Sequence, residues 1–118
     1  MVVVYPGVRA DIRRVTIPGS RLGAISLSGN SILTLAGATV RGIGAGPRRG
    51  NAVWSSGGVV EVAEGSTLIG EQSGIFLAAS DGGTLVPGAG TVLVDASSVV
   101  GIAGSAVVGQ TFPGGSRS

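Results

Sequence analysis

The segment "LTLAGATVRGI", residues 33–43, returns as "VLVDASSVVGI" at residues 92–102, and this repeat decides the predicted fold. A third copy, "VEVAEGSTLIG" at residues 60–70, aligns with one inserted residue, and "ISLSGNSIL" at residues 25–33 resembles a partial fourth. Each copy consists of a strand, a corner of small residues, a second strand and a glycine. The three full copies start 27 and 32 residues apart, which suits coils built from two or three short strands.

Repeated units of this kind predict an all-β fold, a short parallel β-helix (β-solenoid) of about three coils. In such a fold the inward positions require Val, Ile or Leu, and the corners require Gly, Asn, Ser or Asp. We therefore expect Leu33 and Leu35 to point inward, with Val92 and Val94 as their counterparts in a later coil. A flat sheet connected by loops is the alternative fold.

The composition supports short strands joined by tight turns. Gly accounts for 23 of 118 residues, and aromatic residues make up only 3% of the chain. Because the interior of a narrow coil has little room for large rings, this scarcity of aromatic residues fits a β-helix. No stretch of the sequence is apolar for long enough to predict a membrane-spanning helix.

The sequence divides into three regions. Residues 1–22 contain four of the eight arginines and two Pro-Gly turns, and we expect an N-terminal arm or cap. Residues 23–109 form the expected β-helical body, and residues 110–118 a flexible C-terminal tail. Since so few coils leave unpaired backbone and apolar side chains at the ends of the body, we expect a homotrimer.

The sequence predicts no enzyme. It contains no Cys and no His, which removes thiol and imidazole chemistry and most zinc sites. Of its six carboxylates, Glu61 and Glu64 are closest together but are expected to point in different directions. We therefore predict no catalytic, cofactor-binding or metal-binding residues. Ice binding is not expected, because the threonines at positions 34, 39, 67, 84 and 91 suggest no regular array.

All eight basic residues are Arg, and the net charge is only +2. So weak a field, without aromatic platforms or a basic stripe, predicts neither nucleic-acid nor membrane binding. Arg is favoured at protein interfaces because it pairs with carboxylates in bidentate geometry. The predicted contacts with a protein partner or between subunits are Arg9, Arg13, Arg14, Arg21, Arg48 and Arg49. The alternative is ordinary surface charge.

The body resembles two groups of proteins. "GGVVEVAEGSTLIG" at residues 57–70 and "GGTLV" at residues 82–86 are similar to the passenger β-helix of secreted autotransporter adhesins, although the chain shows no secretion signal. The size, the Arg-bearing N-terminal segment and the small-residue coils resemble small trimeric β-helical virion proteins of tailed bacteriophages. This second resemblance implies a capsid cement or decoration protein. It would assemble in the host cytoplasm, bind the major capsid protein on the virion surface and stabilise the shell.

Two other functions are compatible with the same sequence. A self-assembling β-helix of the bactofilin kind would form filaments in the cytoplasm without any partner. A carbohydrate-binding adhesin or tail-spike fragment would carry a cluster of carboxylates or aromatic rings on one face.

Overall fold

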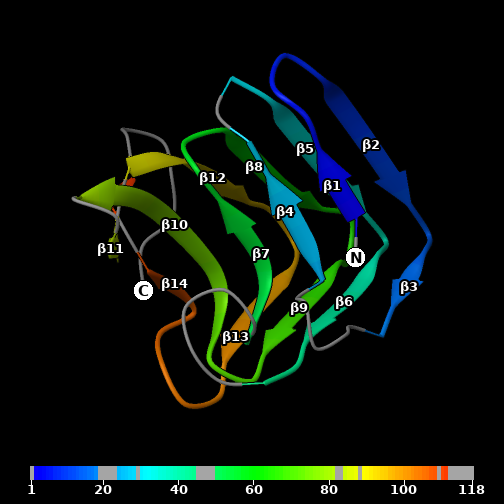
Figure 1. Cartoon of the computed structure of the whole chain (residues 1–118). Helices are drawn as coiled ribbons and strands as arrows, with labels where there is room; N and C mark the ends of the chain where they lie inside the picture. The colour runs from blue at the N-terminus through cyan, green and yellow to red at the C-terminus, as the bar shows by residue number, and fades with distance from the viewer. Residues whose placement is uncertain are drawn as a thin grey trace.

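The computed structural model describes residues 2–18, 24–28, 30–44, 50–81, 84–87, 89–108 and 110–111. Its described residues form strands and no helix, and therefore no helix long and apolar enough to cross a membrane. The strands lie in three parallel sheets that surround one core (Figure 1). This arrangement confirms the predicted short parallel β-helix and excludes a flat sheet.

Each sheet takes one strand from every coil, so that strands distant in sequence lie side by side (Figure 1). Sheet 1 contains β1 (Val2–Val4), β4 (Ile25–Leu27), β7 (Asn51–Ser55), β10 (Ser73–Asp81), β11 (Thr84–Pro87) and β14 (Val107–Val108). Sheet 2 contains β2 (Arg9–Arg13), β5 (Ile32–Ala36), β8 (Val59–Ala63), β12 (Ala89–Val94) and β15 (Gln110–Thr111). Sheet 3 contains β3 (Thr16–Ile17), β6 (Thr39–Gly42), β9 (Thr67–Gly70) and β13 (Ser98–Gly101).

The described strands make four complete coils, at residues 2–17, 25–42, 51–70 and 73–101, followed by β14 and β15 of a fifth. The coils wind within one chain. The additional coil comes from residues 2–17, which the sequence analysis assigned to an arm or cap. In the structure, β1, β2 and β3 pair in parallel with β4, β5 and β6.

The stacking register confirms the three repeats that predicted the fold. Leu33 pairs with Val60, and Val60 with Val92, so the copies are successive layers of one sheet. The prediction that residues 25–33 are a partial copy of the repeat is wrong, because Ile25 lies in sheet 1 between Val2 and Val53. The N-terminal copy is instead at residues 10–17. It is hard to recognise because charged residues alternate with its inward positions.

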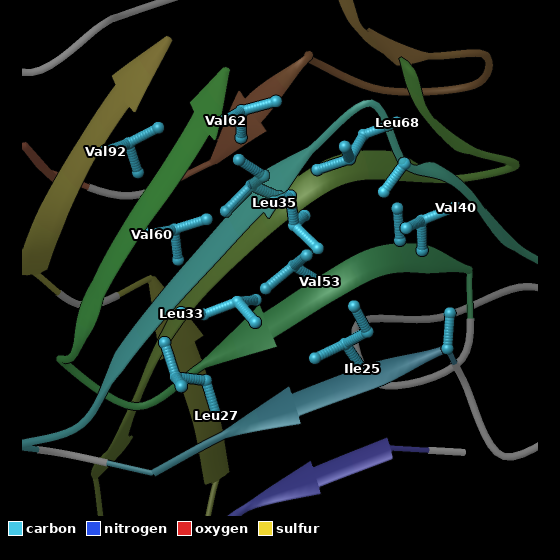
Figure 2. Packing of buried hydrophobic residues seen from close by; sticks show 14 of the residues in the cluster. Ile25, Leu27, Leu33, Leu35, Val40, Val53, Val60, Val62, Leu68 and Val92 are labelled. Carbon is cyan, nitrogen blue, oxygen red and sulfur yellow. The ribbon is translucent and has the colours of Figure 1, made fainter. Parts of the chain in front are cut away.

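Inward-pointing aliphatic side chains from all three sheets form the core (Figure 2). Those of the second and third coils are completely buried, as at Leu33, Leu35, Val60 and Leu68. Alternation of inward and outward side chains along each strand produces this pattern. Trp54 and Phe76 are paired on the outer side of sheet 1, which agrees with the expectation that large rings stay out of the narrow interior.

Glycine ends three of the four strands of sheet 3, where the second, third and fourth coils close. Gly42, Gly70 and Gly101 lie in one column of the stack. A Cβ atom at any of them would overlap the backbone carbonyl group of Asn51, Ser73 or Ser105, respectively. The chain therefore returns to sheet 1 so closely that only glycine fits. This requirement explains the glycine that ends each sequence repeat.

The fourth coil contains the one antiparallel pair among the described strands. β10 extends beyond the other strands of sheet 1 and pairs with β11, with Asp81 opposite Thr84. Two glycines separate these partners in the sequence, a pattern typical of a tight hairpin turn. The predicted parallel β-helix did not include a strand that reverses direction, as β11 does.

Candidate functional site

Large exposed apolar side chains of the described residues belong to the first coil, to the fourth coil and to the turn that directly follows the fourth coil. Four are in the first coil and three in or directly after the fourth, whereas the described part of residues 24–77 contributes none. Those of the first coil are Val3, Tyr5, Val8 and Val15, and those of the fourth are Leu93, Val100 and Ile102. Tyr5 is the most exposed, at 68%. The first and fourth coils therefore carry the large apolar side chains on the surface of the described structure.

The first coil also presents the open edges of all three sheets. β1, β2 and β3 each stand at the end of the strand order of their sheet, and no described strand pairs with their outer edges. Open edges expose backbone groups that can pair with another chain. β2 carries charged residues along its outer face, which discourages uncontrolled pairing, whereas β1 is the uncharged sequence Val-Val-Val.

Three of the predicted partner-binding arginines lie on this coil. Arg9 and Arg13 are at the two ends of β2, and Arg14 follows immediately. All three are exposed. Arg21, Arg48 and Arg49 lie outside the described residues. The structure thus gathers Arg9, Arg13 and Arg14 on the coil that carries the exposed apolar side chains.

The corner between sheets 2 and 3 has an unusual backbone conformation. Its four stacked residues, one from each coil, have left-handed φ angles: Arg14 at 54°, Gly37 at 60°, Glu64 at 56° and Ala96 at 48°. Hydrogen bonds between coils hold the corner, including those from the Arg14 N–H to the Ala36 carbonyl at 2.9 Å and from the Gly37 N–H to the Ala63 carbonyl at 3.3 Å. Only glycine adopts this conformation without strain, yet three of the four residues are not glycine.

A groove of about 490 Å³ opens at this corner, lined by Arg13, Arg14, Ala36, Gly37 and Glu64. The small residues of the second coil form its middle, between the arginines of the first coil and the carboxylate of the third. Arg13 spans the groove. Its Nε lies 3.1 Å from Asp11 Oδ1, and its Nη1 lies 3.5 Å from Glu64 Oε2.

The stem of Arg13 has a second role beside these ion pairs. Ala36 points outward from β5, opposite Arg13 in the register, yet is only 3% exposed. Long arginine side chains bury their methylene groups on apolar surface while keeping the guanidinium in water. We infer that Arg13 covers Ala36 in this way. The two ion pairs are solvent-exposed and individually weak, typically about 0.2–1 kcal/mol.

A separate ion pair lies on another part of the surface. Arg41 Nη2 is 3.6 Å from Glu71 Oε2, and the same carboxylate accepts a hydrogen bond from the Gly44 N–H at 3.1 Å. In the stack, Arg41 lies beside Ile69, which in turn lies beside Val100. The repeats differ at this place, where Arg41 aligns with Val100, and both residues fall within one outward column of sheet 3.

A column of hydroxyl groups on sheet 3 was not predicted from the sequence. Thr16, Thr39, Thr67 and Ser98 are stacked in register along the outer face of sheet 3. The expectation that the threonines form no ladder was therefore wrong for positions 39 and 67. The signal was present as a Thr or Ser three residues before each repeat glycine, including Gly19, which lies outside the described residues. The neighbouring column is not polar, since it contains Ile69 and Val100.

The described carboxylates do not converge. Glu61 is on the outer face of β8, Glu64 is at the corner and Asp95 follows β12. Within the described residues, no three His, Cys, Asp or Glu side chains are grouped so that they could hold a metal ion. The aromatic pair on sheet 1 is mostly covered, because Phe76 is 8% exposed and Trp54 is half-buried.

Comparison with known proteins gives no relative for this chain: no family model matches it, nor does any curated protein or solved structure.

Proposed function

We propose that the protein is a structural component of a virion. Three copies would bind the outside of an assembled capsid and stabilise the shell. The mechanism is mechanical, because each bound copy buries surface on the shell and so opposes its opening. It requires neither turnover nor a cofactor.

The observation that carries the proposal is the restriction of large exposed apolar side chains of the described residues to the first coil and to the fourth coil with its following turn. In the first coil they lie together with Arg9, Arg13 and Arg14. Aromatic residues and arginine are enriched at protein interfaces, where rings supply contact area and guanidinium groups pair with carboxylates. A first coil of this composition suits a docking surface for a protein.

The first and fourth coils would make different contacts. The first coil combines apolar and charged side chains. Such a mixed surface suits contact with the outside of a shell, which is exposed to water and is therefore partly polar. Leu93, Val100 and Ile102 of the fourth coil are exposed without arginine neighbours in their strands. Contacts between identical subunits are generally more apolar than other interfaces. We therefore assign the fourth coil to contacts among the three copies.

The test combines assembly with shell binding. The purified protein should sediment as a trimer and should pellet with capsids assembled from the major capsid protein of the same genome. Tyr5→Lys should abolish pelleting with capsids, because it puts a charge at the most exposed ring of the first coil. Ser56→Lys, at an exposed position of the third coil, is the matched control and should bind normally. A monomer that neither forms filaments nor binds capsids would contradict the proposal.

A second candidate function has one observation in its favour. The open edges of β1, β2 and β3 could pair with another copy and build filaments from the protein alone. Electron microscopy of the purified protein distinguishes the two functions. Filaments without capsid would favour self-assembly, and discrete trimers would favour the decoration protein.

A further inference from the structure

We propose that the corner groove is a binding site for a carboxylate side chain of a protein partner, with Arg14 as its main contact. The inference deepens the proposed function and rests on it only in taking the shell protein as that partner. Its chemistry is the recognition of Asp or Glu by a guanidinium group.

The shape of the groove suits an inserted acidic side chain. Its volume is about 490 Å³, and the second coil contributes only the small residues Ala36 and Gly37 to its lining. A water molecule occupies about 30 Å³ in the liquid, so a carboxylate side chain fits there together with part of its hydration shell. Arg13 and Arg14 stand on one side of this space, where they can donate hydrogen bonds to the incoming oxygens.

Arg14 is the residue whose presence the fold does not require. Its backbone is held at a φ of 54°, where glycine is preferred, and the next coil has Gly37 at the equivalent place. Its guanidinium forms no ion pair with the described residues, unlike those of Arg13 and Arg41. Strained non-glycine residues are often kept for function. We infer that Arg14 is retained for its charge.

Arg13 is positioned to assist, because its ion pair with Glu64 is easily exchanged. The Nη1–Oε2 distance is 3.5 Å, and both side chains are more than half exposed. The contact with Asp11 holds the other side of the guanidinium at 3.1 Å. An incoming carboxylate would therefore take the place of Glu64 at Nη1 without releasing Arg13 from Asp11.

Glu64 weakens the attraction of the groove for anions. Its carboxylate lines the groove and offsets part of the positive charge of Arg13 and Arg14, so charge alone gives a dianion such as phosphate less advantage than two unopposed arginines would. A peptide can add contacts along the first coil that inorganic phosphate cannot make, and we therefore expect the acidic peptide to bind more tightly.

The experiment is an NMR titration of the isotopically labelled full-length protein with a short peptide that contains three consecutive glutamates. We expect shifts at the backbone amides of Arg14 and Gly37 and at the guanidinium of Arg14. The shifts should weaken as salt is added, because the contact is partly solvent-exposed. A peptide with three glutamines in place of the glutamates, and inorganic phosphate, should cause no comparable shift.

Two glycine substitutions provide the matched comparison. Arg14→Gly removes the guanidinium from a left-handed position, and Ala96→Gly makes the same backbone change at the equivalent corner of the fourth coil. Both substitutions relieve backbone strain, so both variants should fold. Loss of the charged contact should weaken peptide binding about tenfold in Arg14→Gly, and Ala96→Gly should bind like the unmodified protein.

Three results would overturn the inference: equal binding by the two variants, shifts centred on Arg41, or tighter binding of phosphate than of the acidic peptide. The proposed function can fail separately. If the groove binds the peptide but the protein does not pellet with capsids, the site stands and the virion role falls. If Tyr5→Lys abolishes capsid binding and Arg14→Gly does not affect it, the role stands without this site.

Discussion

The first and third coils have the same three strands, but their inward side chains are buried to different extents. In the third coil the inward residues Val53, Val60 and Leu68 are completely buried, because coils lie on both sides. Their counterparts in the first coil, Val2, Ala10 and Ile17, are only half-buried. In a solenoid each coil contacts only its neighbours, so a terminal coil has one face left to cover.

The first and third coils also differ in the apolar side chains that they expose. The first coil exposes four large apolar side chains, and the third exposes none. The middle coils thus supply most of the stability of the isolated chain, while the first coil keeps apolar surface that another protein can bury. The predictions that follow test this division, beginning with the largest expected effect.

Removing the same kind of side chain should be much more damaging in the third coil than in the first. Leu68 and Ile17 lie in one column of sheet 3. Leu68→Ala leaves a cavity between two coils and should lower the free energy of unfolding by about 2–5 kcal/mol. Ile17→Ala removes a half-buried side chain, and we expect a loss of about 1–2 kcal/mol. Urea denaturation measures both losses, and equal values would contradict the proposed difference between the coils.

Within the third coil, replacing glycine by alanine should reduce stability more at one corner than at another. At Gly70 a Cβ atom would overlap the Ser73 carbonyl, so Gly70→Ala should lower the free energy of unfolding by about 3 kcal/mol. Gly65 has a φ of 77° but open space around it, and Gly65→Ala should lower the free energy by only about 1 kcal/mol. Thermal denaturation of the two variants gives the comparison. A larger loss for Gly65→Ala would mean that backbone conformation, and not close approach, determines how the coil closes.

Substitutions to glycine at the left-handed corner should raise the free energy of unfolding instead of lowering it. Glu64→Gly and Arg14→Gly relieve strain and should each raise the free energy of unfolding by about 0.5–1 kcal/mol. The gain should be slightly smaller for Glu64→Gly, because this substitution also removes the Arg13–Glu64 ion pair. Gly37→Ala should lower it by about 1 kcal/mol, since the φ there is 60°. The midpoints of chemical denaturation measure these changes. Destabilisation by Arg14→Gly would show that its side chain supports the fold.

Much of the fold was predictable because its rules are local. Alternation in "LTL" and "VLV" identifies inward positions, and the repeated glycine marks the place where the coil closes. The first coil was missed because Arg9, Asp11 and Arg13 occupy the outer face of β2, and their charges hide Ala10 and Ile12 behind a polar pattern.

Other features depend on contacts between coils and leave little trace in the sequence. The left-handed conformation of Arg14, Glu64 and Ala96 is maintained by hydrogen bonds to neighbouring coils, so residue type alone does not predict it. The groove is equally hidden, since its lining residues come from three different coils. The sequence named Arg13 and Arg14 as predicted contacts, but their meeting with Glu64 could be recognised only from the stacking register.

The smallest effect on stability is expected at the edge of the first coil. Val3 is 43% exposed on the outer side of β1, and Val3→Lys should change the free energy of unfolding by no more than about 0.5 kcal/mol. The same substitution should weaken binding to capsids, because a charged edge strand resists pairing. Pelleting of the variant with capsids measures this binding. Unchanged pelleting would remove β1 from the proposed docking surface.

The most direct test of the central claim, that the first coil is a docking surface, is hydrogen exchange of the free and capsid-bound protein. In the free protein, amides of β1, β2 and β3 should exchange faster than those of β7, β8 and β9, because terminal coils open locally at lower free energy. On binding, protection should increase in the first coil and remain unchanged in the third. Protection that increases elsewhere, while the first coil continues to exchange rapidly, would contradict the account.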